Sequence, residues 1–182
     1  MKMKTTTLII GGCRSGKSGY ALRLADARRG GKNLFVATCA PQDKEMTERV
    51  KRHQIERGDR WQTIEAPLDP AAVLHDHGSG ADILVIDCLT LWVSNLMMTG
   101  QKDEQIIDNI SRLCDSLMKT PCPVILVSNE VGTGIVPENA LARRYRDLIG
   151  WCNQRAATAC DRVIWMVAGI AVPIKPKPSF NG

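Results

Sequence analysis

Aromatic residues are scarce in this chain of 182 residues, which has four Trp, two Tyr and two Phe. So few rings leave little for stacking on bases, and the basic residues form no tract, so we expect no nucleic-acid partner. Long apolar runs are absent as well. A run such as 83–86 is far short of the roughly 20 apolar residues that a membrane-spanning helix needs. We therefore expect no membrane-spanning segment.

The cysteines lack any C-x-x-C pair, and their number, seven, is odd. This pattern argues against both a disulfide framework and a zinc site. A secretory leader, in which charged residues precede an apolar stretch, is also missing before the first predicted strand. We therefore expect a cytoplasmic protein with reduced thiols.

The composition that is present is ordinary, with 44% hydrophobic and 24% charged residues, which is typical of a soluble globular protein. Lys and Arg total 24 against 19 Asp and Glu, and the formal net charge is +5. The excess lies in short basic pairs, which are either solvated helix faces or contacts for an anionic small molecule. The length favours one domain.

Strand and helix patterns alternate along the chain. Short β-branched and apolar runs predict strands at 6–10, 34–37, 61–64, 83–86, 124–127 and 163–167. Helical spacing predicts helices at 18–28, 43–57, 70–75, 89–98, 103–117 and 138–160. This alternation predicts an α/β fold: a single domain whose mostly parallel sheet is covered by helices on both faces. The phosphate loop described below makes this a P-loop NTPase-type domain.

The C-terminal part of the sequence is rich in proline, at Pro173, Pro176 and Pro178. Proline cannot continue a central strand, so we expect an extended tail here. We assign residues 1–174 to the catalytic domain and residues 175–182 to the tail.

Residues 11–18 fit the complete phosphate-loop pattern G-x-x-x-x-G-K-[ST]. Glycines let such a turn fold with its backbone amides facing phosphate oxygens. Lys17 supplies a positive charge to the β- and γ-phosphates, and the Ser18 hydroxyl is suited to bind Mg²⁺. With a predicted strand before it and a predicted helix after it, the segment indicates that the chain binds a nucleoside triphosphate. The predicted phosphate-binding residues are Gly11, Gly12, Cys13, Arg14, Ser15, Gly16, Lys17 and Ser18.

Asp87 directly follows the apolar strand predicted at 83–86. A carboxylate there would reach a metal ion bound to the phosphates, although a lone Asp also serves as a strand-end cap or turn former. Because the chain carries a phosphate loop, we favour a role for Asp87 in metal or nucleotide binding.

His53 and Arg57 are four residues apart and share one face if the helix predicted at 43–57 persists. A neutral imidazole beside a guanidinium is suited to attack an α-phosphate whose charge the arginine neutralises. From spacing alone, an ordinary surface histidine is the simpler interpretation.

Three segments together resemble one known family. They are the phosphate loop, the stretch His-x-x-x-Arg-x-x-x-Trp-x-Thr-x-Glu at 53–65, and residues 129–139, which read Asn-Glu-Val-Gly-Thr-Gly-Ile-Val-Pro-Glu-Asn. On these motifs the chain resembles the bifunctional adenosylcobinamide kinase / adenosylcobinamide-phosphate guanylyltransferase family of cobalamin assembly. The resemblance runs from about Thr7 to Ile174.

The resemblance implies two reactions. The enzyme would first phosphorylate the aminopropanol hydroxyl of adenosylcobinamide with ATP or GTP. It would then transfer GMP from GTP onto that phosphate, releasing pyrophosphate and giving adenosylcobinamide-GDP. In the family the guanylyl group rests on a histidine, and His53 stands at that motif position. Lys17 and His53 are thus the expected catalytic residues.

The resemblance also implies the surroundings of the nucleotide. Mg²⁺ is the expected cofactor, with Ser18 and Asp87 as its ligands, and the family domain is commonly assembled as a trimer. Beyond the phosphate loop, the expected nucleotide-binding residues are Ala37, Thr38, Cys39, Gln54, Ile55, Glu56, Arg57, Glu65 and Asp87.

Glu65 is suited to accept hydrogen bonds from N1–H and the amino group of guanine. The alternative interpretation is that Glu65 is an ordinary solvated carboxylate at the end of a strand. Two other functions stay open at this point. One is a regulatory or scaffold protein that binds nucleotide without transferring it, and the other is a small-molecule kinase without guanylyl transfer.

Overall fold

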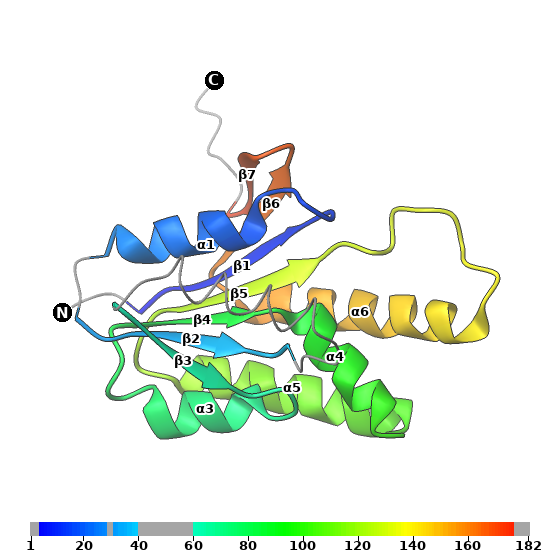
Figure 1. The fold of residues 1–182 in the computed structure, drawn as a ribbon, viewed down its shortest axis with the longest axis horizontal. Helices are drawn as coiled ribbons and strands as arrows, with labels where there is room; N and C mark the ends of the chain where they lie inside the picture. The colour runs from blue at the N-terminus through cyan, green and yellow to red at the C-terminus, as the bar shows by residue number, and fades with distance from the viewer. Residues whose placement is uncertain (1–3, 29–30, 40–59, 177–182) are drawn as a thin grey trace, which may run out of the picture.

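The computed structural model of the protein describes residues 4–28, 31–39 and 60–176. In these residues one sheet has seven strands in the order β3-β2-β4-β5-β1-β6-β7, as Figure 1 shows. The strands are β1 (Thr6–Gly11), β2 (Asn33–Ala37), β3 (Trp61–Glu65), β4 (Ile83–Asp87), β5 (Val124–Asn129), β6 (Arg162–Val167) and β7 (Ile170–Lys175). The helices are α1 (Lys17–Asp26), α3 (Pro70–His77), α4 (Leu89–Met98), α5 (Asp103–Lys119) and α6 (Ala140–Ala159). The helix predicted at 43–57 lies outside the described residues.

The sheet is covered on both faces, as predicted. On one face α1 buries Ala21 and Ala25 against alternate strand residues such as Ile9 and Val85. The other face of the sheet is covered by α3, α4, α5 and α6 (Figure 1). These helices pack over the strand residues whose side chains point the opposite way, such as Leu8. Both faces of the central strands are therefore apolar, which explains why the sequence shows continuous apolar runs instead of alternation.

The register aligns the carboxyl ends of the central strands. Gly11 of β1 pairs with Asn129 of β5, and Ala37 of β2 pairs with both Asp87 of β4 and Glu65 of β3. The predicted strands at 83–86 and 124–127 extend to Asp87 and Asn129. In a sheet of this kind, ligands bind beyond the carboxyl ends of the strands, so this edge is where a site is expected.

The last strand was missed by the sequence analysis. Pro173 was expected in a tail, but it lies in β7, which pairs antiparallel with β6. The two residues between the strands, Ala168 and Gly169, have φ of 50° and 82°, and such a two-residue turn with positive φ matches the twist of a hairpin. Proline is tolerated because β7 is an edge strand and its pairing with β6 shifts register between Val163 and Ile164.

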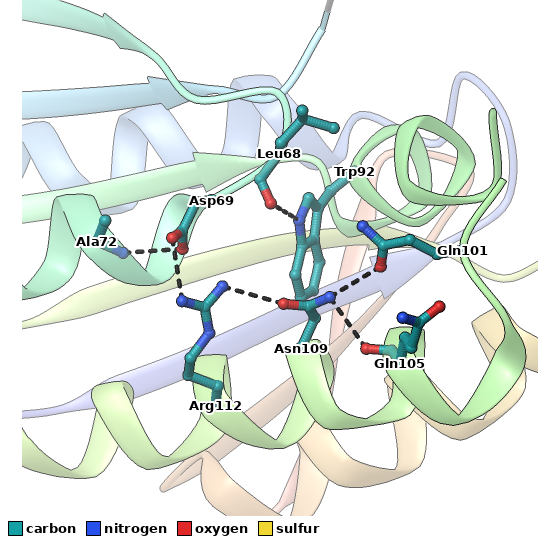
Figure 2. A network of polar contacts seen from close by, with 8 residues as sticks. All are labelled: Leu68, Asp69, Ala72, Trp92, Gln101, Gln105, Asn109 and Arg112. Atoms are coloured by element: carbon teal, nitrogen blue, oxygen red, sulfur yellow. Dashed lines mark hydrogen bonds and ion pairs between the residues drawn. The ribbon is translucent and has the colours of Figure 1, made fainter. Parts of the chain in front are cut away.

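The segment that follows β3 is fixed by the helices beneath it (Figure 2). Trp92 of α4 donates its indole N–H to the Leu68 carbonyl at 2.9 Å. The carboxylate of Asp69 accepts from the Ala72 amide at 3.1 Å, capping α3, and from Arg112 of α5 at 3.1 Å. These contacts join the segment after β3 and the start of α3 to α4 and α5.

No helix among the described residues combines the length and the apolar character needed to cross a membrane. The division into a domain at 1–174 and a tail at 175–182 stays a prediction.

Candidate active site

The predicted phosphate loop connects β1 to α1 at the carboxyl edge of the sheet. Gly16 precedes α1 with a φ of 90°, and Arg14 also has a positive φ, of 54°. Glycine is the residue that adopts such a conformation without strain. A Cβ at Gly11 would lie 2.3 Å from the carbonyl oxygen of Met166 on β6, so no larger residue fits there. The glycines of the motif are therefore required by this fold.

Lys17 is the buried cation of the loop, with 7% of its surface exposed. Its ammonium donates to the carbonyl oxygen of Gly12 at 2.6 Å and to the hydroxyl of Ser15 at 3.4 Å. Burial lowers the pKa of Lys17 below its ordinary value, and the negative charge of Asp87 opposes that change. The side chain is thus held beside the loop, in a position from which it can meet phosphate oxygens.

The hairpin of β6 and β7 supports the same loop. The Gly169 amide donates to the Ser15 carbonyl at 3.2 Å, and the Cα of Gly169 lies 3.6 Å from the position that a Cβ of Gly16 would take. This contact could not be predicted from the sequence, because residues 15 and 169 are distant in the chain and the turn lacks an Asn-Gly signal.

Asp87 lies at the end of β4, close enough to the Lys17 ammonium for its charge to affect the pKa of that group. Ser18 follows Lys17 in the first turn of α1 and is exposed. The structure thus brings Asp87, one of the two predicted metal ligands, near the predicted catalytic lysine, and the metal-binding role of Ser18 and Asp87 stays a prediction. The described residues contain no group of three His, Cys, Asp or Glu side chains that could hold a metal ion by themselves.

Thr38 is buried, and its polar groups are bound by the protein. Its hydroxyl accepts from the Cys88 amide and donates to the Cys88 carbonyl, each at 2.7 Å. Its amide donates to the carbonyl of Asp87 at 3.2 Å, and its carbonyl accepts from the Asn95 side chain at 2.8 Å. In this structure Thr38 ties the end of β2 to the turn after Asp87, and its contact with a nucleotide stays a prediction.

A second set of polar side chains fixes the same turn from the other side. The hydroxyl of Thr90 accepts from the Asn129 side chain at 3.0 Å and lies 3.0 Å from the sulfur of Cys88. Burial raises the pKa of the Cys88 thiol to about 11, so this thiol is neutral at physiological pH. The Asn153 side chain of α6 donates to the Asn129 carbonyl at 3.1 Å. Of these supporting residues, Thr90 and Cys88 lie in none of the motifs that carry the family resemblance.

The remaining predicted nucleotide-binding residues divide into two groups. Ala37 is buried, Cys39 is half-buried, and Glu65 is exposed at the end of β3, and all three lie at the carboxyl edge that carries the phosphate loop. His53 and the four neighbours predicted to contact nucleotide, Gln54, Ile55, Glu56 and Arg57, lie outside the described residues.

Comparisons with known proteins show to which family the chain belongs. Residues 7–174 match the model of the family described as cobinamide kinase / cobinamide phosphate guanyltransferase. The chain is 43% identical over 172 residues to the bifunctional adenosylcobalamin biosynthesis protein CobP of Pseudomonas aeruginosa, covering 94% of this chain and 98% of that protein. It is 38% identical over 181 residues to the protein of the same description, CobU, of Salmonella typhimurium, covering 92% and 98%.

Solved structures with similar folds have little sequence in common with the chain. The RadB recombinase matches with a TM-score of 0.52 at 17% identity, over 88% of this chain and 73% of that one. The flagellar accessory protein FlaH of Methanocaldococcus jannaschii matches with a TM-score of 0.50 at 13% identity, over 94% and 78%. These two likenesses show the α/β fold alone. The family match and the sequence identity to CobP and CobU show the family as well as the fold. The chain belongs to the cobinamide kinase / cobinamide phosphate guanyltransferase family and is an enzyme of the two activities for which that family is named.

Proposed function

We propose that the enzyme phosphorylates the aminopropanol hydroxyl of adenosylcobinamide with ATP or GTP. It then transfers GMP from GTP to that phosphate through a guanylyl group on His53, giving adenosylcobinamide-GDP for cobalamin biosynthesis. One observation carries the proposal. A complete phosphate loop, with its buried Lys17 beside Asp87, lies in a chain that matches the family over residues 7–174.

In the kinase step the substrate hydroxyl attacks the γ-phosphorus. Catalysis here is mainly a matter of positioning and of stabilising charge on the transferred group. Lys17 supports that role because its ammonium already lies within the loop, 2.6 Å from the Gly12 carbonyl. The positive end of α1, which begins at Lys17, would favour the negative charge of the same phosphates.

Mg²⁺ is the proposed cofactor, and its ligands would be Ser18 and Asp87. A hydroxyl and a carboxylate are oxygen donors of the kind Mg²⁺ prefers, and the ion keeps further positions for phosphate oxygens and water. When bound, the ion neutralises charge on the β- and γ-phosphates. Two protein ligands suffice for such a site.

In the guanylyltransferase step a nucleophile attacks the α-phosphorus, and we propose that it is His53. An imidazole forms a covalent intermediate that divides one difficult displacement into two easier ones. Glu65 would accept hydrogen bonds from guanine, and its exposed position at the end of β3 leaves its carboxylate accessible to a base. We further propose a homo-oligomer, a trimer, in the cytoplasm, without a nucleic-acid partner.

The decisive experiment follows the label of α-labelled GTP. Wild type, His53→Ala and His53→Asn are incubated with labelled GTP and Mg²⁺ and then denatured in alkali, in which a phosphoramidate survives. The wild type should retain label that is lost in acid, and both His53 variants should retain none. His75→Ala, an exposed histidine on α3, is the matched control and should label like the wild type.

Each outcome separates the candidate functions. Label retained by His53→Ala would show that another residue is the nucleophile. If the wild type transfers γ-phosphate but never retains label, the protein is a small-molecule kinase that forms no covalent guanylyl intermediate. Binding of GTP without transfer of either group would identify a regulatory nucleotide-binding protein.

A further inference from the structure

A hollow of about 230 Å³ opens beside the phosphate loop. Its walls come from three segments. They are the start of the phosphate loop at Gly12, the segment after β5 at Glu130 and Thr133, and the carboxyl end of β6 at Trp165 and Val167. Ligand pockets for whole small molecules measure roughly 300–1,000 Å³. The hollow therefore fits one arm of a larger molecule and not its whole body.

The hollow has a polar side and an apolar side. Among the described residues that line it, Glu130 is the only ionisable one, and Trp165 and Val167 face the hollow as apolar groups that are 42% and 40% exposed. A ligand arm that carries a polar group at its end and belongs to an apolar body fits this division. A nucleotide phosphate would instead meet the negative charge of Glu130.

Glu130 is held in place by two contacts of its own and by a third that fixes the turn after it. Its amide donates to the Gly11 carbonyl at 3.0 Å, which fixes it to the end of β1. One carboxylate oxygen, Oε1, accepts from the Gly132 amide at 2.6 Å. Arg146 of α6 donates to the Gly132 carbonyl at 3.0 Å and so fixes the turn from outside. The carboxylate is therefore oriented before any ligand binds.

The γ-phosphate end of the proposed nucleotide site adjoins the hollow. Lys17, whose counterpart in phosphate loops contacts the β- and γ-phosphates, places its ammonium 2.6 Å from the carbonyl of Gly12. Gly12 also lines the hollow. A group bound in the hollow thus lies next to the phosphoryl group that a kinase transfers.

We propose that this hollow is the acceptor site of the kinase step and that Glu130 is its general base. The hydroxyl-bearing arm of the corrinoid enters the hollow, and its O–H proton passes to the Glu130 carboxylate. The freed oxygen forms the new bond to the γ-phosphorus as the bond from that phosphorus to the β-phosphate oxygen breaks, and ADP or GDP leaves. This inference rests on the proposed function.

The two steps of the enzyme differ in their need for this base. In the kinase step the acceptor is an alcohol, which must lose a proton as it attacks. In the guanylyl step the acceptor is already a phosphate, whose ionised oxygen attacks without a base. A general base typically contributes about 10²–10⁴-fold to a rate, so Glu130 should affect the first step far more than the second.

The test uses Glu130→Gln in the full-length enzyme, because the amide keeps an oxygen for the Gly132 amide but cannot take a proton. One assay supplies adenosylcobinamide and ATP and measures phosphorylation. The other supplies adenosylcobinamide phosphate and GTP and measures formation of the GDP product. We expect phosphorylation to fall at least about a hundredfold in kcat and guanylyl transfer to stay within about threefold of the wild type.

Two further variants sharpen the result. A Cβ at Gly132 would lie 2.9 Å from Oε1 of Glu130, so Gly132→Ala should displace the carboxylate and lower phosphorylation by less than Glu130→Gln does. Glu104→Gln, an exposed glutamate in the first turn of α5, is the control and should leave both assays unchanged.

The outcomes that overturn the inference are distinct. Equal loss in both assays would mean that Glu130 only maintains the loop. Normal phosphorylation by Glu130→Gln would remove it as the base. A raised KM for ATP with unchanged kcat would assign the hollow to the phosphoryl donor. Failure of the wild type in either assay would instead contradict the proposed function itself.

Discussion

Charged side chains have different roles at the amino ends and at the carboxyl ends of the parallel strands. At the amino ends, carboxylates are bound by the protein's own donors. Asp161 accepts from the amide and the hydroxyl of Thr6 at 2.8 and 2.9 Å, and Asp82 accepts from the amides of Gly31 and Lys32 at 2.8 and 3.0 Å. These bonds join loops to strands and leave those donors occupied.

At the carboxyl ends, the charged groups are collected around the phosphate loop. Lys17 is buried there at a cost that shows in its lowered pKa, and the end of β4 places Asp87 close to it. Burying a cation costs free energy, which the hydrogen bonds to Gly12 and Ser15 and the charge of Asp87 offset only in part, because the pKa of Lys17 is still lowered. The comparison indicates that one end of the sheet is built mainly for stability and the other mainly for chemistry, and three substitutions test that division.

The largest effect is expected for Lys17→Ala. Loss of the ammonium should lower the kinase rate at least about a hundredfold, because charge on the transferred phosphoryl group is no longer stabilised. The midpoint of urea unfolding should hardly change, since the variant removes a buried charge that the fold itself does not need. Kinase assays and urea titrations on the same preparation measure both. A folded variant with near-normal phosphorylation would remove Lys17 from the mechanism.

An intermediate effect is expected for Thr38→Val, which tests whether the chemical end is also held by structural hydrogen bonds. Valine keeps the shape of threonine but leaves the buried amide and carbonyl of Cys88 without the Thr38 hydroxyl. The free energy of unfolding should fall by about 1–3 kcal/mol. Thr158→Val, at an exposed position of α6, is the control and should change little. An unchanged stability for Thr38→Val would mean that water replaces the hydroxyl.

The smallest effect is expected at the amino end, for Asp161→Asn. The amide and hydroxyl of Thr6 favour the charged carboxylate and lower the pKa of Asp161 below its ordinary value of 3.8. Its stabilisation is therefore present above the unfolded pKa and is lost as the pH falls through the lower folded pKa. Because Asp161 is exposed, the difference from wild type should stay under about 1 kcal/mol.

Thermal unfolding between pH 7 and pH 3 measures this difference. Wild type should be the more stable protein at neutral pH, and the two curves should converge in acid. Asp76→Asn, an exposed carboxylate on α3, is the control. A difference that grows as the pH falls would contradict the assignment.

The parts of the site that the sequence predicted are those set by local pattern. The phosphate loop is a continuous motif, and the carboxyl edge follows from where apolar strands end. Gly11 and Asp87 were predicted from the pattern at the ends of their own strands, whereas Ala37 and Glu65 were implied by the family resemblance, and the register of the sheet places all four along one edge. Parallel strands make this possible, because their carboxyl ends meet on the same side.

The parts that the sequence did not predict depend on long-range pairing. Thr38 bonds to Cys88 only because β2 and β4 are neighbours. The β6–β7 hairpin reaches the phosphate loop through Gly169, and its Ala-Gly turn is not a common hairpin signal. The guanylyl role of His53 stays a prediction, because residues 40–59 lie outside the described part of the chain.

The central strand β1 is made long before the strands with which it pairs, and this affects folding during synthesis. Among the described strands β1 is synthesised first, yet its partners in the sheet are β5 and β6, which begin at Val124 and Arg162. At about 5–20 residues per second, the ribosome adds Gly169 roughly 8–30 s after Ser15, the residue whose carbonyl it binds. The segment that will hold the nucleotide therefore has no sheet partner for most of translation. A nascent chain should gain the ability to bind nucleotide abruptly, when its last strands emerge, and not gradually as it lengthens.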